Sequence, residues 1–180
     1  TAVTLNLAGA DVGTGVGQVM ASNSSDFGGA TWVAYATSLN WTLTAGEGTK
    51  TVYIRFRDRA GNESDACSDT IVLDTTPPTG SILIEGGAEV VTDTQVVLTL
   101  SASDTNGVTH LRLRNDKAAW SAWDPFVTSH TWTLPAQSGE HTVGVQFRDG
   151  AGNVSVAYSD AISYEPPVYS VYLPLLMRNR

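Results

Sequence analysis

The sequence predicts an all-β protein made of two tandem antiparallel β-sandwiches. Three observations lead to this prediction. A long stretch of sequence occurs twice, apolar and polar residues alternate within each copy, and turn-forming residues separate the alternating runs at short intervals. A period of two is typical of strands that bury one face, whereas a helix repeats its apolar residues every three or four positions.

The repeat defines two folding units. The motif Trp41-Thr42-Leu43 recurs as Trp132-Thr133-Leu134, which is an offset of 132 − 41 = 91 residues. The same offset relates residues 41–71 to residues 132–162 without a gap. Because composition alone does not produce a match of this length, each copy is predicted to fold as one unit.

Alternation within the copies places the strands. Val52, Ile54 and Phe56 are expected to face a core while their neighbours face water, and the second copy repeats this pattern. Apolar pairs predict earlier strands at Leu5 and Leu7, at Leu98 and Leu100, and at Leu111 and Leu113. Residues 58–62 and 149–153 are predicted to form the hairpin between the last two strands, because Gly adopts positive φ and Asp and Asn bond turn amides. About seven strands in about 90 residues is the plan of an immunoglobulin-like sandwich.

A proline linker separates the two copies. In Asp74-Thr75-Thr76-Pro77-Pro78, two prolines remove backbone donors and favour an extended connection. We therefore predict a first module at residues 1–76, a second at 77–165 and a C-terminal tail at 166–180.

Charge and cysteine content exclude several classes of function. The chain of 180 residues has a formal net charge of −8, and nucleic acids and anionic membranes bind proteins through clustered Lys and Arg. No apolar run approaches the roughly 20 residues of a membrane-spanning helix. The single cysteine, Cys67, cannot form an internal disulfide, and we predict a free, buried thiol.

Motifs in both copies resemble a known family. The signature Phe-Arg-Asp-x-Ala-Gly-Asn-x-Ser at 56–64 and 147–155, the proline linker, and the stretch from Arg114-Asn115-Asp116 to Trp120-x-x-Trp123 are similar to tandem bacterial immunoglobulin-like (fibronectin III or Ig-like) repeats of large secreted and cell-surface proteins. The tail resembles the Tyr-Leu-Pro-Leu tails of some secreted proteins. The resemblance implies an extracellular or cell-surface location and a spacer, adhesive or scaffold role, with no catalytic residue.

Calcium is the alternative to a protein without cofactors. Asp11, Asp58, Asp104 and Asp149 offer hard oxygen ligands of the kind that calcium gathers from the loops of extracellular modules. No dense Asp-x-Asp-x-Asp loop accompanies them, and turn capping is the favoured role for Asp58 and Asp149. We therefore expect no cofactor.

The tryptophans raise a hypothesis of carbohydrate binding. Trp41 and Trp132 recur beside a core leucine and are predicted to pack in the sandwich. Trp32, Trp120 and Trp123 are assigned to the region where the copies differ, where exposed rings would stack on sugars. The alternative is that these three rings close the open end of a sandwich.

Modification and catalysis have weaker signals. Four asparagines satisfy the glycosylation rule Asn-x-Ser/Thr, namely Asn23, Asn40, Asn62 and Asn153, although chance supplies such sites in a chain rich in Ser and Thr. The histidines fall on different predicted strands, and none forms a nucleophile and base pair. His110 and His141 are assigned to outward, solvated positions.

The two ends of the chain depart from the repeat. The second copy begins with a strand predicted at 79–84, and the first copy has no equivalent, so Val3, Leu5 and Leu7 are expected to border an unpaired edge. The tail is predicted to be an extended strand with an apolar face. Its residues expected to contact another subunit are Val168, Tyr169, Val171, Leu173, Leu175 and Met177.

Together these ends predict head-to-tail assembly. The tail of one subunit would complete the first module of the next by strand addition, and such a contact generates a filament. Pro174 would have to lie at an edge-facing position, because it cannot donate to a ladder. One alternative is that the tail packs on its own second module, and another is that a segment preceding Thr1 supplies the missing strand.

The sequence therefore predicts a non-enzymatic extracellular structural protein, a filament or surface-fibre subunit joined by C-terminal strand donation. The alternative is an adhesin or a carbohydrate-binding accessory module of a larger secreted protein.

Overall fold

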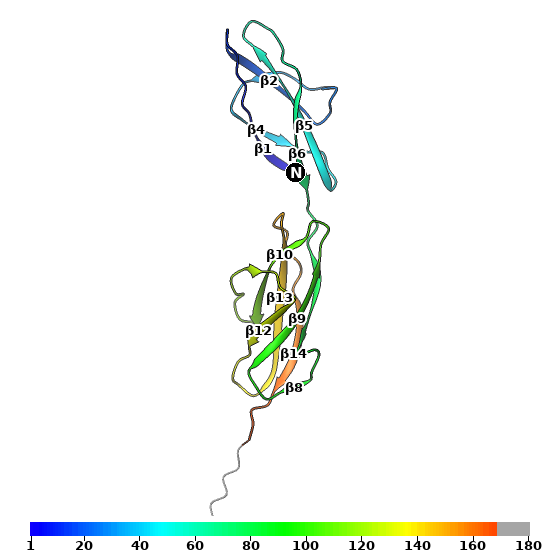
Figure 1. The fold of residues 1–180 in the computed structure, drawn as a ribbon, viewed down its shortest axis with the longest axis vertical. Helices are drawn as coiled ribbons and strands as arrows, with labels where there is room; N and C mark the ends of the chain where they lie inside the picture. The colour runs from blue at the N-terminus through cyan, green and yellow to red at the C-terminus, as the bar shows by residue number, and fades with distance from the viewer. Residues whose placement is uncertain (169–180) are drawn as a thin grey trace, which may run out of the picture. The chain divides into compact units, whose positions relative to one another are not determined.

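The computed structural model describes residues 1–168 of the chain. These residues form strands and no helix, which confirms the predicted all-β class (Figure 1). Accordingly, no helix within this range has the length and hydropathy needed to span a membrane. The chain divides into two compact units, Thr1–Thr75 and a second unit that starts at Thr76.

The second unit is a sandwich of two sheets. Its strands are β7 (Thr79–Ile84), β8 (Val90–Val91), β9 (Gln95–Ser103), β10 (Val108–Asn115), β11 (Asp124–Pro125), β12 (Ser129–Thr133), β13 (Gly139–Asp149) and β14 (Tyr158–Tyr164). One sheet has the order β12-β9-β7 and the other β11-β10-β13-β14-β8. All neighbouring pairs are antiparallel except β14 and β8.

Alternation along the strands builds the core of this unit. Val143, Val145 and Phe147 of β13 are fully buried, as predicted. Ile82 of β7 and Leu98 of β9 meet them from the other sheet. Burying side chains of this kind stabilises the fold by about 1.5–3 kcal/mol each, so the two facing sheets hold the unit together.

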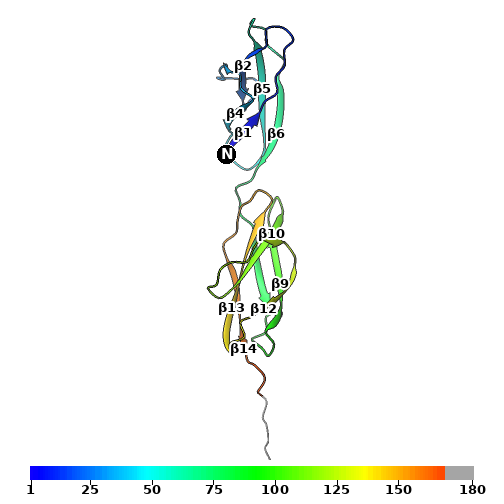
Figure 2. The same ribbon diagram turned by 90° about the vertical axis from the view of Figure 1, so that its left-hand side faces the viewer.

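The first unit has the same plan with fewer strands. Its strands are β1 (Ala2–Asn6), β2 (Val16–Ser22), β3 (Val33–Ala34), β4 (Ser38–Thr42), β5 (Gly48–Asp58) and β6 (Cys67–Leu73). The sheets are β1-β4 and β3-β2-β5-β6, and Figure 2 shows β5 beside β6. These six strands correspond in order to β9 to β14, so the described part of the first unit has no counterpart of β7 or β8.

The difference in strand number changes the environment of β6. Ile162 of β14 is 2% exposed, whereas its repeat partner Ile71 of β6 is 46% exposed. Cys67, at the start of β6, is also exposed, so the predicted buried thiol is wrong. The reason is that β7 covers β14 in the second unit, while no described strand covers β6 in the first.

Candidate functional site

A groove lies in the first unit between β1 and β6. It has a volume of about 380 Å³, and its apolar lining includes Val3, Leu5 and Leu7, the predicted edge residues. Phe56 of β5 and Ile71 of β6 also line it. The groove is therefore bordered by the strands that correspond to β9, β13 and β14 of the second unit. We call it the β1–β6 groove.

A tryptophan and an asparagine clamp the sheets of each unit together. In the first unit, Trp41 Nε1 donates to Asn23 Oδ1 at 2.8 Å, and Asn23 Nδ2 donates to the Thr42 carbonyl at 3.0 Å. In the second unit, Trp132 Nε1 donates to Asn115 Oδ1 at 2.7 Å, and Asn115 Nδ2 donates to the Thr133 carbonyl at 2.9 Å. Both tryptophans also pack on their cores, as predicted. Sequence reasoning missed the asparagine partner, although Asn23 directly follows β2 and Asn115 is the last residue of the equivalent strand β10.

Removing either asparagine is expected to destabilise its own unit. Asn23→Ala or Asn115→Ala leaves a half-buried indole N–H without its acceptor, which should lower the free energy of unfolding by about 1–2 kcal/mol. Asn40→Ala is the matched control, because Asn40 is exposed on β4 and its amide makes no hydrogen bond within the described residues. Chemical unfolding measures the effect, and equal losses for Asn23→Ala and Asn40→Ala would contradict the clamp.

Aspartates cap the hairpin turn that follows β5 and β13. Asp58 Oδ1 accepts the Asn62 N–H at 2.8 Å, and its Oδ2 accepts Asn62 Nδ2 at 2.7 Å. These bonds favour the ionised carboxylate and lower the pKa of Asp58. Asp149 makes the same contacts with Asn153 at 2.9 and 2.8 Å. The predicted hairpin between the last two strands is thus confirmed in both units.

The other calcium candidates also bond to turn amides. Asp11 Oδ2 accepts the N–H groups of Gly13 and Gly15 at 3.0 and 2.8 Å. Asp104 Oδ1 accepts the Asn106 N–H at 2.8 Å. Local hydrogen bonding therefore gives these carboxylates a role in their turns, and calcium binding stays the alternative.

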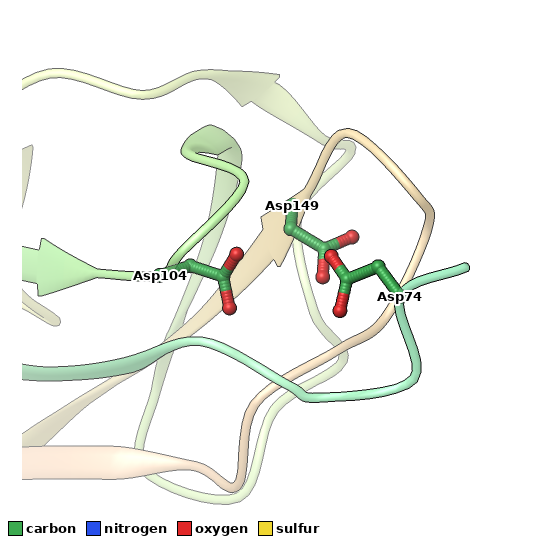
Figure 3. Close-up of side chains that lie close together, drawn as sticks. All are labelled: Asp74, Asp104 and Asp149. Atoms are coloured by element: carbon green, nitrogen blue, oxygen red, sulfur yellow. The ribbon is translucent and has the colours of Figure 1, made fainter. Parts of the chain in front are cut away.

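Two of the calcium candidates lie near each other in the second unit. Carboxylate oxygens of Asp104 and Asp149 lie within 4.8 Å of one another (Figure 3). Asp74, also labelled in Figure 3, belongs to the first unit. Both oxygens of Asp149 already accept hydrogen bonds from the Asn153 turn, which favours the capping role.

Arginines stack on the predicted carbohydrate-binding rings. Arg57 lies 4.1 Å from the ring centroid of Trp32, and Arg148 lies 4.7 Å from that of Trp123. The assignment of these two tryptophans to a variable region is wrong, because 123 − 32 = 91 makes them repeat partners. Cation–π stacking of this kind fixes one face of each ring.

Trp120 extends the stack in the second unit. Arg114 lies 4.4 Å from its centroid, and Arg112 lies 5.1 Å from Trp120 and 4.6 Å from Trp123. All three predicted sugar-binding tryptophans are half-buried rather than fully exposed. Sugar binding by these rings stays a prediction.

The glycosylation candidates differ in the freedom of their amides. The amides of Asn23, Asn62 and Asn153 bond within the fold. Asn40, on the exposed face of β4, makes no such bond within the described residues. If glycosylation occurs, Asn40 is therefore the position at which it would disturb the fold least.

His141 is buried, so its assignment to an outward position is wrong. It shares the parity of Val143, Val145 and Phe147 along β13, and the alternation itself places it on the inner face. Its Nε2 lies 2.7 Å from the Gln137 carbonyl, and its Nδ1 lies 3.2 Å from Asp116 Oδ2. The Gln137 carbonyl first, and then Asp116, raise the pKa of His141 against the opposing effect of burial.

The His141 contacts predict a pH-dependent stability of the second unit. A raised pKa in the folded state means that the protonated ring stabilises the unit fully below its unfolded pKa of about 6.5, and that this contribution is lost as the pH rises through the folded value. The melting temperature of the second unit should thus fall by a few degrees between about pH 6 and about pH 8. His141→Gln should remove this change and His110→Gln should keep it, as measured by calorimetry across the range; an unchanged pH profile in His141→Gln would contradict the assignment.

The predicted subunit-contact residues of the tail fall largely outside the described range. Tyr169, Val171, Leu173, Leu175 and Met177 lie beyond residue 168, and Val168 is exposed. Their partners in the prediction, Val3, Leu5 and Leu7, lie in the β1–β6 groove.

Comparison with known proteins identifies the fold. No protein-family model matches the sequence, and no curated protein matches it. The structure of fibronectin(III)-like modules of Clostridium thermocellum CbhA matches with a TM-score of 0.54 and 16% identity, over 96% of this chain and 91% of that chain. The fold is that of tandem fibronectin(III)-like modules. A tetra-tandem repeat from the extending region of a large adhesion protein matches with a TM-score of 0.32 and 17% identity, over 83% of this chain and 42% of that chain.

Proposed function

We propose that the chain is a non-catalytic pair of fibronectin(III)-like accessory modules within a secreted or cell-surface protein. The observation that carries this proposal is that the repeated polar side chains form hydrogen bonds within each unit. Asn62 and Asn153 bond the turn aspartates, and the repeated tryptophans bond the clamp asparagines. These repeated side chains form hydrogen bonds within the fold, so the residues that the two modules share stabilise their architecture.

The fold supports the same proposal. CbhA is similar to this chain in the architecture of its fibronectin(III)-like modules, over nearly the full length of both chains. The repeat motifs resemble those of secreted and surface proteins, which supports an extracellular location. A spacer of stiff sandwiches joined by a proline linker accounts for both features.

A glycan and substrate panel tests the proposed function. The full chain is assayed on a glycan array, on insoluble polysaccharides and with glycoside and ester substrates. A spacer should show neither retention nor turnover. Retention that is lost in Trp123→Ala but kept in Asn40→Ala would instead favour a carbohydrate-binding module or adhesin, and turnover would contradict the non-catalytic proposal.

The β1–β6 groove favours a second candidate function, a filament or fibre subunit. In this role the tail of one copy adds a strand to the first unit of the next. A chain ending at Glu165 should then fail to assemble, while the full chain forms filaments visible by electron microscopy. Filaments that persist without the tail, or a full chain that stays monomeric in light scattering, would contradict this role.

A further inference from the structure

We propose that the β1–β6 groove binds one extended polypeptide strand with the residue pattern of β7, antiparallel to β1. The pattern is a glycine followed by aliphatic residues at the second and fourth positions after it, as in Gly80, Ile82 and Ile84. This inference concerns the same groove as the second proposed function but goes beyond it, because it names a strand pattern that the tail does not have. It does not require that the strand come from the tail.

The second unit shows how such a strand is held. Ile82 and Ile84 lie opposite Leu100 and Leu98 of β9, and both isoleucines are buried. The strand β7 packs between β9 and β14, so it closes the sandwich on that side. A strand in this position joins both sheets of the unit.

The first unit presents the matching positions. Val3 pairs with Trp41 as Val96 pairs with Trp132, which makes Leu5 and Leu7 the counterparts of Leu98 and Leu100. Both leucines line the β1–β6 groove. β1 also has an unpaired edge, because it pairs only with β4 among the described strands. The groove thus offers an added strand both an unpaired backbone edge and an apolar lining.

A carboxylate in the groove supplies a specific backbone acceptor. In the second unit, Asp160 Oδ1 accepts the Ala161 N–H, and its Oδ2 accepts the Ile84 N–H of β7 at 2.8 Å. In the first unit, Asp69 Oδ1 accepts the Thr70 N–H in the same way. Asp69 lines the groove, and its Oδ2 has no hydrogen-bond partner within the described residues. It is placed to receive the N–H of the fourth residue after the glycine.

The space beside the phenylalanine explains the need for glycine. A Cβ at Gly80 would lie 2.5 Å from the Phe147 ring and 2.5 Å from the Ser101 carbonyl oxygen. Phe56, the counterpart of Phe147, lies in the groove. Residues 168–177 of the tail contain no glycine, and Pro174 lacks an N–H, so the tail matches this pattern less well than β7 does.

Cys67 provides a direct readout, because it is exposed, lines the groove and is the single cysteine. The probe is a synthetic peptide of residues 79–85 with added lysines for solubility, mixed with the full chain. We expect the peptide to slow the reaction of Cys67 with a thiol reagent several-fold and to raise the melting temperature of the first unit while leaving the second unchanged.

Matched variants separate the steps of the proposal. A peptide with valine in place of the glycine should protect Cys67 poorly. Asp69→Ala should weaken protection by the original peptide, whereas Asp65→Ala, an exposed control in the turn before β6, should not. The glycine pattern would be overturned if the valine peptide, or a peptide of residues 168–177, protected Cys67 as well as the original peptide does. The strand site itself would be overturned if no peptide protected Cys67. Peptide binding without filaments would contradict the filament role alone.

Discussion

Phe147→Ala is expected to lower the free energy of unfolding of the second unit by about 3–5 kcal/mol. The Phe147 ring is fully buried at the centre of the sandwich. Phe126 and Tyr158 lie with their ring centroids 5.8 and 6.1 Å from it. Truncation removes this packing and leaves a cavity between two sheets whose backbones are fixed by their ladders, so the site cannot collapse fully.

The repeat provides a matched control for this substitution. Phe56 occupies the equivalent position in β5 but is only half-buried, because it lies in the β1–β6 groove. Phe56→Ala should therefore cost the first unit less, roughly 1–2 kcal/mol. Hydrogen exchange measured separately for β5 and β13 during chemical unfolding gives both values. Equal losses at the two positions would show that Phe56 is as well covered as Phe147, contrary to the difference between the units.

The sequence was sufficient to predict the architecture because its determinants are local and occur twice. The offset of 91 residues identified the units, and the alternation of Val143, Val145 and Phe147 identified an inner face. The turn at residues 149–153 followed from the conformational freedom of glycine and the capping ability of aspartate. Each of these features depends on residues close together in the chain.

Burial was harder to predict where it depends on a distant strand. The prediction of a buried free thiol at Cys67 rests only on the lack of a disulfide partner, whereas its cover would be a counterpart of β7, which belongs to another part of the sandwich. His141 is the opposite case. Its parity with Val143 indicates the inner face, contrary to the outward position assigned to it, and only the nearby Asp116 and Gln137 show how the ring is satisfied.

The candidate sites show the same division. The edge residues Leu5 and Leu7 were identified from the missing strand, and they line the groove. The hydrogen bond between Asn23 and Trp41 joins residues on different sheets, so no local pattern predicts it. The stacking of Arg57 on Trp32 is likewise not predicted by a local pattern. The common offset between Trp32 and Trp123 does indicate that the two rings are repeat partners.

Gly80→Ala is expected to destabilise the second unit by about 3 kcal/mol, at the upper end of the usual range for overpacking. The added Cβ would meet the Phe147 ring and the Ser101 carbonyl oxygen, each at 2.5 Å. The carbonyl belongs to β9, the strand that pairs with β7, so it cannot move without disturbing the ladder. The substitution should therefore separate β7 from the rest of the unit and expose Ile82 and Ile84.

Gly144→Ala is the control, because it places a methyl group in a strand of the same unit without a close contact. Its nearest neighbours are flexible atoms of Arg114 at 3.4 Å, and its backbone does not need positive φ. Its effect should be small, or slightly stabilising through the lower entropy of the unfolded chain. Calorimetry of the two variants measures the difference. If Gly80→Ala proved as mild as Gly144→Ala, then β7 would tolerate a side chain beside the phenylalanine, and the glycine requirement inferred for a strand bound in the β1–β6 groove would lose its physical basis.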